Sequence, residues 1–161
     1  MSAHFTLAEM AFSDTATRLG IDNSIPAWLM KVADSTMSNM EQVRAILNVP
    51  VQINSAYRCE ALERVLCQKD FVAWCLRHKK DPAKDWPLYY VNKDHPKLLA
   101  VDFKAPAFGT PEQIVAKLVK SPLMFKQLIC EGTWVHIAFG GTKREVMTAT
   151  FSNGTPTYTM G

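Results

Sequence analysis

The sequence predicts an α+β domain, and three observations support this prediction. Apolar residues recur near helical spacing through the segment 26–48. The segment 51–58 alternates apolar and polar residues at period two, which is typical of a half-buried strand. Two further apolar runs, 99–103 and 133–139, read as strands and carry polar side chains inside them or at their start. Helices and strands therefore both contribute to the core.

Composition is consistent with one ordinary globular domain. The 161 residues are 48% hydrophobic and 20% charged, with no internal repeat and no linker, so we expect a single domain spanning 1–161. The net charge of +3 is small, and the basic residues are scattered along the chain. It would favour approach to an anionic polymer such as a bacterial wall, and the absence of a basic-aromatic platform argues against nucleic acid.

We expect neither a membrane span nor a secretory leader. No run of about 18 apolar residues is present, so membrane insertion is not expected. The first residues lack the basic-then-apolar pattern of a signal peptide. We expect a protein that is cytoplasmic when made and that meets the cell wall only after release or as part of a virion.

Helix signals come in order along the first half of the chain. Thr6 with Glu9 forms a capping box, Ser13 starts a second helix, and Gly20 stops it. Pro26 opens the longest helix. A further single helix is expected over 60–78, with these apolar residues available for burial: Leu62, Val65, Leu66, Val72, Trp74, Cys75 and Leu76.

The second half alternates loops with shorter elements. The segment 81–93 is expected to be a loop, with 88–91 docked on the core or forming a short strand. Thr110 and Pro111 start a helix. The segment 145–151 is expected to be the last strand, with a loosely held tail after Gly154.

Four cysteines, Cys59, Cys67, Cys75 and Cys130, show no C-x-x-C spacing. Cys67 and Cys75 lie eight positions apart, on one face of a helix. Buried thiols are therefore favoured over a disulfide or a cysteine zinc site.

Three side chains suggest a metal site. His95 stands at the entry to one strand, Asp102 lies within it, and His136 lies within the other. On that second strand His136 shares a face with Trp134. If the two strands are neighbours in the sheet, Asp102 and His136 can lie close together. Two imidazoles and a carboxylate suit zinc with one position left for water. The alternative is a pair of packed histidines and an ordinary strand-edge aspartate, and spacing alone does not decide between them.

Several segments resemble phage-associated zinc D-Ala-D-Ala carboxypeptidase-like proteins and L-alanyl-D-glutamate peptidases. The resembling segments are 5–9, 13–23, 41–44, 50–58, 125–129 and 133–137. In that family the pattern S-x-H-x-x-G-x-A-x-D precedes a distant W-V-H, and His95, Ala100, Asp102 and His136 stand at the matching positions.

The resemblance implies a fold, a cofactor and a substrate. It implies a Hedgehog/DD-peptidase type of α+β fold, with helices packed on a small antiparallel sheet. It also implies Zn²⁺ held by His95, Asp102 and His136, and hydrolysis of an amide bond in peptidoglycan stem peptides by a phage endolysin or a virion-associated wall peptidase. Two departures stand out: the serine of the pattern is Lys93 and its glycine is Leu98.

Two further residues are candidates for catalysis. Some relatives carry an acid three positions before the last histidine, where this chain has Thr133, so Glu131 is the nearest candidate base. Arg58 resembles the arginine of the family's S-G-Y-R run, which would bind a substrate carboxylate or the developing oxyanion; a surface ion pair is the alternative. These departures leave open a second function, that of a non-catalytic, zinc-stabilised wall-binding or structural phage module.

Overall fold

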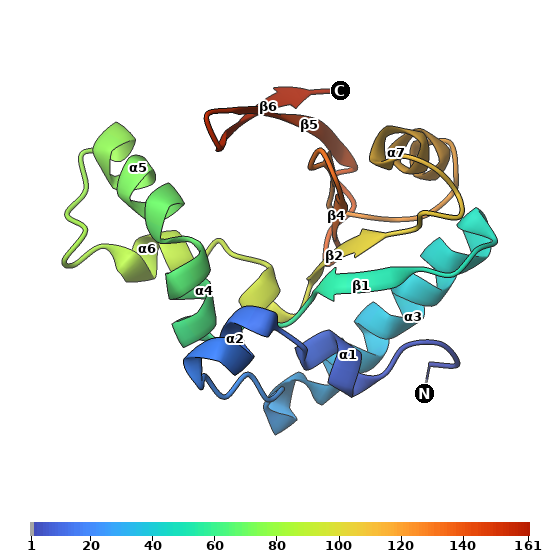
Figure 1. The fold of residues 1–161 in the computed structure, drawn as a ribbon, viewed down its shortest axis with the longest axis horizontal. Coiled ribbons are helices and arrows are strands. Elements are labelled where there is room, and N and C mark those ends of the chain that lie inside the picture. Colours follow the sequence, from blue (N-terminus) through green and yellow to red (C-terminus); the bar gives the residue numbers. More distant parts are fainter. Residues whose placement is uncertain (1) are drawn as a thin grey trace.

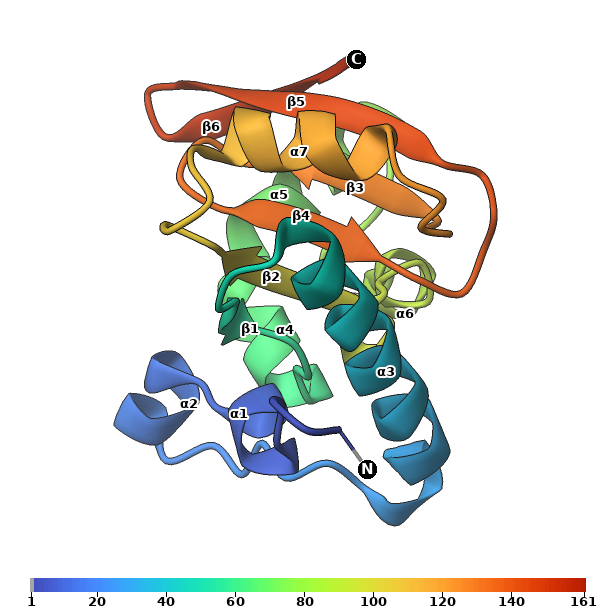
Figure 2. The same cartoon turned by 90° about the vertical axis from the view of Figure 1, so that its right-hand side faces the viewer.

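A six-stranded mixed sheet with helices on both sides forms the body of the molecule (Figures 1 and 2). The structure, a computed structural model, describes residues 2–161. The strands are β1 (Gln52–Ser55), β2 (Ala100–Lys104), β3 (Gln127–Cys130), β4 (Val135–Ala138), β5 (Glu145–Ser152) and β6 (Thr155–Met160), in the spatial order β1-β2-β4-β3-β5-β6. The α+β prediction is confirmed.

The resemblance implied a purely antiparallel sheet, but the sheet is mixed. Strands β3 and β5 pair in parallel, with Gln127 opposite Glu145, whereas every other neighbouring pair is antiparallel. The reason is topological: the chain reverses direction from β3 to β4 and again from β4 to β5, and β5 lies beside β3 rather than beside β4. Strands β3 and β5 therefore run the same way.

The helices are α1 (Leu7–Ala11), α2 (Asp14–Leu19), α3 (Met30–Leu47), α4 (Glu60–Leu66), α5 (Gln68–His78), α6 (Trp86–Tyr90) and α7 (Pro111–Val119), with 3-10 turns η1 (Ala27–Leu29) and η2 (His95–Lys97). The predicted caps are present. Thr6 and Glu9 form the capping box of α1, and Ser13 accepts from the Ala16 amide at the start of α2. Gly20 ends α2 in the left-handed region.

Helices α3 and α7 cover one face of the sheet (Figures 1 and 2). The alternate residues of β2 and β4 that point to this side are fully buried: Val101, Phe103, Val135 and Ile137. They pack with the apolar stripe of α3, which includes Met37, Met40 and Val43. The opposite face of the sheet is left for other side chains, among them Asp102 and His136.

The predicted helix 60–78 is wrong in one respect, because the chain breaks at Cys67 into α4 and α5. Phe71 and Cys75 of α5 pack with Trp86 and Tyr89 in a small second core, separate from that of the sheet. Four residues expected to be available for burial are instead substantially exposed: Val65, Leu66, Val72 and Leu76. We call the segment from Glu60 to Tyr90, which projects to one side of the sheet in Figure 1, the helical arm.

The segment 81–93 contains helix α6, so the expected loop or short strand is wrong there. Pro87 lies in the first turn of α6, where its missing N–H costs nothing. The Trp86 indole N–H donates to the Glu60 carboxylate at 2.9 Å, which fixes α6 against α4. Burial of Trp86 and Tyr89 in the second core explains why this segment is helical.

The tail after Gly154 is also ordered, in contrast to the expectation. Strand β6 pairs with β5 along its length, from Ser152 opposite Thr155 to Met147 opposite Met160. Asn153 and Gly154 both have positive φ, at 51° and 76°, as a two-residue hairpin turn requires. Among residues 2–161, none of the helices combines the length and apolar character needed to cross a membrane.

Candidate metal centre

Sheet register brings two of the predicted ligands together. Asp102 of β2 lies directly opposite His136 of β4 in the antiparallel pair. Both side chains point away from α3 and α7, because their neighbours Val101, Phe103 and Val135 occupy the core face. The face assignment made from the sequence is therefore confirmed.

His95 reaches the same place from the turn η2, which precedes β2. Its Nδ1 lies 2.7 Å from the carbonyl oxygen of Ala56. Since a carbonyl only accepts, Nδ1 carries the proton and Nε2 is left free on the side of Asp102. Leu98 ends η2 with φ 55° and ψ 31°, and it stands where the family pattern has glycine. The backbone conformation that glycine favours is thus kept, although the glycine is not.

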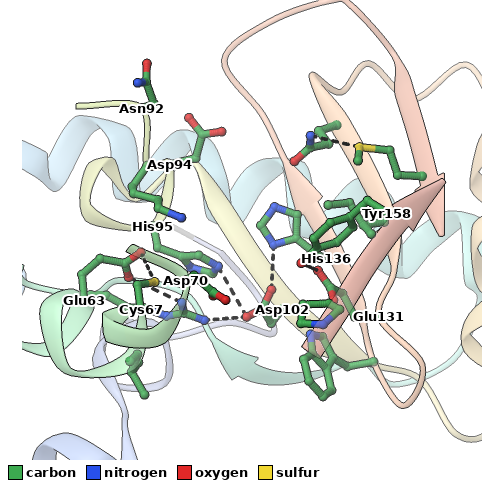
Figure 3. Close-up of a pocket in the computed structure, with 18 of the residues that line it drawn as sticks. Glu63, Cys67, Asp70, Asn92, Asp94, His95, Asp102, Glu131, His136 and Tyr158 are labelled. Atoms are coloured by element: carbon green, nitrogen blue, oxygen red, sulfur yellow. Dashed lines mark hydrogen bonds and ion pairs between the residues drawn. The ribbon is translucent and has the colours of Figure 1, made fainter. Parts of the chain in front are cut away.

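The three candidate ligands form a tight group (Figure 3). One ligand atom from each of His95, Asp102 and His136 lies within 4.8 Å of the others. Asp102 Oδ1 is 2.8 Å from His136 Nδ1, and Oδ2 is 3.4 Å from His95 Nε2. The two imidazole rings meet nearly edge to face, with centroids 5.3 Å apart.

Electrostatics keep the carboxylate ionised. Burial alone would raise the pKa of Asp102, but the imidazoles of His95 and His136 outweigh burial and hold it well below the usual range for aspartate. A buried carboxylate that stays charged is a ready cation ligand. The donor set of two imidazoles and one carboxylate fits zinc with a position open for solvent or substrate. The Ala56 carbonyl supplies the outer hydrogen bond that zinc-binding histidines usually make.

Arg58 adjoins this group and is not a surface ion pair, because its side chain is only 15% exposed. It follows β1, which ends at Ser55, earlier than the predicted 51–58. The Nε–H donates to Ser55 Oγ at 2.9 Å, and one terminal nitrogen donates to Asp102 Oδ2 at 2.7 Å. The guanidinium has five N–H groups, so donors remain for a substrate oxygen.

These residues lie in a cavity of about 430 Å³ between the sheet and the helical arm (Figure 3). The sheet side is partly apolar and includes Ile129, Trp134, Met147, Phe151 and Tyr158. The arm and the η2 loop contribute mainly polar and charged groups, including Glu63, Asp70, Lys93 and Asp94. The cavity is large enough to hold part of a peptide and presents the candidate ligands on its wall.

Glu131 lies in the same cavity, at the turn between β3 and β4. Burial raises its pKa above the ordinary glutamate value; nearby His136 opposes this shift and Asp102 adds to it. Its Oε1 accepts from the Tyr158 hydroxyl at 3.4 Å. Gly132, with φ 76°, allows the tight turn that leads from Glu131 back to Trp134. A carboxylate with a raised pKa in a cleft can act as a general base.

The sequence did not point to two further residues of the site. Glu63 is buried and faces Arg58, yet its place in a helix full of charges gave no sign of this. Tyr158 belongs to β6, which was expected to be a loose tail. The Asn153-Gly154 pair was the signal that would have predicted the hairpin and, with it, Tyr158 in the cavity.

All four cysteines are free, and Cys67, Cys75 and Cys130 are buried while Cys59 is half-buried. Burial raises the pKa of the Cys67 thiol to about 12, so this cavity-lining cysteine is not a thiolate nucleophile at neutral pH. The prediction of buried thiols is confirmed for three of the four.

One comparison with known proteins bears on the site. A family model described as Peptidase M15 matches residues 3–67. This match supports the M15 family of zinc peptidases and covers about two fifths of the chain, including Arg58 and Glu63. The candidate ligands His95, Asp102 and His136 lie beyond the matched residues. No match was found among curated proteins or among solved structures.

Proposed function

We propose that this chain is a zinc-dependent peptidase that hydrolyses an amide bond in peptidoglycan stem peptides, as a phage endolysin or a virion-associated wall peptidase. The observation that carries the proposal is the convergence of His95, Asp102 and His136 in one cavity with Glu131 and Arg58. The match to Peptidase M15 supports peptidase chemistry independently of these ligands. The peptidoglycan substrate and the phage role rest on the resemblance of the sequence segments.

The proposed ligands are His95 through Nε2, the carboxylate of Asp102, and His136. Zinc held there would act as a Lewis acid on the scissile carbonyl and would activate a water molecule. The Ala56 carbonyl fixes the ring of His95, and the strand pairing of β2 with β4 fixes the other two ligands. Because nitrogen ligands bind metal without a proton, cation binding competes with the proton that His136 Nδ1 shares with Asp102.

Glu131 is the proposed general base. It would take the proton of the attacking water and deliver it to the leaving amine. Its raised pKa keeps it basic enough to accept this proton and still able to release it. The Tyr158 hydroxyl donates to Glu131 and holds the carboxylate toward the cavity. Arg58, with N–H groups left over, would bind a carboxylate or carbonyl oxygen of the substrate.

The apolar sheet side of the cavity suits the small methyl side chains of a stem peptide. Trp134, Phe151 and Tyr158 would contact such groups, while the polar arm side would contact the peptide's charged groups. Whether the bond cut is the terminal D-Ala-D-Ala bond or the L-Ala-D-Glu bond depends on how these two sides seat the peptide.

Purified walls and defined muropeptides test the proposal. The zinc-loaded protein should release new amino termini from walls, and both chelation and His136→Ala should abolish the release. Mass spectrometry of the fragments then identifies the bond. Bound zinc without any product, across wall types and pH, would contradict the enzyme and leave a zinc-stabilised wall-binding or structural module.

A further inference from the structure

Glu63 is a buried acid to which the proposed chemistry assigns no role. Its side chain is only 1% exposed, although it lies in the charge-rich helix α4. One carboxylate oxygen accepts from the Cys67 thiol at 3.1 Å, and the other lies 3.5 Å from a terminal nitrogen of Arg58. Burying a carboxylate is costly unless an opposite charge is near, so Arg58 is its natural partner.

Arg58 lies between two carboxylates, those of Asp102 and Glu63. One terminal nitrogen donates to Asp102 and the other faces Glu63, while the Nε–H donates to Ser55. Without Glu63, the positive charge of Arg58 would be matched by Asp102 alone. With Glu63, the three side chains together carry one net negative charge beside the two histidines.

We propose that Glu63 is a positioning residue for the metal centre, which acts through Arg58. It offsets the charge of the guanidinium and holds it in place, so that the negative charge of Asp102 remains available to a divalent cation. This inference rests on the proposed function, because it presumes that the His95, Asp102 and His136 group holds zinc. Outer partners of metal ligands commonly change metal affinity by about 10–100-fold.

Three variants of the full chain test the proposal through zinc affinity, measured by competition with a chelator of known affinity. Glu63→Gln keeps the size and an acceptor oxygen but removes the charge, and it should weaken zinc binding about 10–100-fold. The double variant Arg58→Gln with Glu63→Gln restores the net charge, and it should recover at least tenfold of the affinity lost. Glu60→Gln is the matched control on the same helix; Glu60 bonds Trp86 outside the metal group, so zinc affinity should not change.

The outcomes separate the inference from the function on which it rests. Wild-type affinity in Glu63→Gln would overturn the inference while leaving the zinc site intact. A double variant as weak as Glu63→Gln would also overturn it, because the loss would then reflect packing rather than charge. Thermal unfolding of each apo variant identifies a folding defect. If Glu63→Gln does not fold, the double variant provides the test, and a zinc affinity of the double variant far below that of the wild type contradicts the proposal. A wild-type chain that binds no zinc would remove the proposed function and this inference together.

Discussion

The two sides of the cavity, the sheet and the helical arm, differ in the hydrophobic core that supports them. The sheet wall, formed by the cavity-facing residues of β2 to β6 and of the β3–β4 turn, is backed by the main core, and strand register sets where Asp102 and His136 point. The helical arm has only a small core of its own around Phe71 and Trp86, and it leaves apolar residues such as Leu76 exposed. The comparison indicates that strand pairing fixes Asp102 and His136, whereas the arm acts on the metal group through Glu63 of α4, which faces Arg58.

Among substitutions on the sheet side of the cavity, replacement of the proposed base Glu131 should lower activity the most. Glu131→Gln is expected to lower kcat by about 10²–10⁴-fold, the usual contribution of a general base, with zinc content unchanged. Because the folded-state pKa of Glu131 is raised, protonation favours the folded state. Its ionised form therefore costs stability at neutral pH, and this cost disappears as the pH falls below the ordinary glutamate range.

Glu131→Gln should accordingly melt higher than wild type at pH 7 to 8 and no higher at about pH 4. Steady-state kinetics and thermal unfolding at several pH values measure both effects. The exposed Glu112 offers a control, since Glu112→Gln should leave kcat unchanged. Full activity in Glu131→Gln would remove this residue from the mechanism.

Destabilising the core of the arm should affect substrate binding and zinc binding differently. Phe71 is 5% exposed and contacts Trp86 and Tyr89 through its ring, so Phe71→Ala should destabilise the arm by about 3–5 kcal/mol. We expect the KM for muropeptides to rise while zinc affinity stays near wild type. Leu76→Ala is the control, because Leu76 is 83% exposed and should change stability by no more than about 0.5 kcal/mol. Loss of zinc from Phe71→Ala would show that the aromatic core of the arm, and not Glu63 alone, supports the metal centre.

Leu98, at the end of the η2 turn that carries His95, tests how the metal centre tolerates a departure from the family pattern. Its left-handed backbone costs about 1–2 kcal/mol in a non-glycine residue, but its fully buried side chain contributes more. Leu98→Gly and Leu98→Ala should both be destabilised, by about 1–4 kcal/mol, with the glycine variant about 1 kcal/mol the more stable. Denaturant unfolding measures this order. An alanine variant as stable as the glycine variant would contradict the strain at this position.

Tyr158 should give the smallest effect, because its bond to Glu131 is long, at 3.4 Å. Tyr158→Phe removes a donor that lowers the pKa of Glu131, so this pKa should rise further. The acid limb of the kcat/KM profile should then move to higher pH, with a loss of about two- to fivefold near neutrality. Tyr90→Phe, outside the cavity, should leave the profile unchanged. An unmoved acid limb in Tyr158→Phe would show that the hydroxyl does not act on Glu131.

The sequence predicts the structure of the sheet wall better than that of the helical arm. Period-two alternation assigned the faces of 99–103 and 133–139 correctly, because a one-residue shift would expose Val135 and Ile137. That constraint made the meeting of Asp102 and His136 predictable. The arm offered no such constraint: the break at Cys67 and the helix at Trp86 depend on tertiary packing of aromatic rings. Glu63 was missed for the same reason, since local pattern does not show which charge of a polar helix turns inward.

The most direct test is a zinc titration of the metal-free protein, followed by calorimetry and by metal analysis of the dialysed complex. The wild-type chain should bind one zinc ion per molecule, and His136→Ala and Asp102→Asn should retain none under the same dialysis. Zinc absent from the wild-type chain, or retained in equal amount by both variants, would contradict the metal centre on which the proposed function depends.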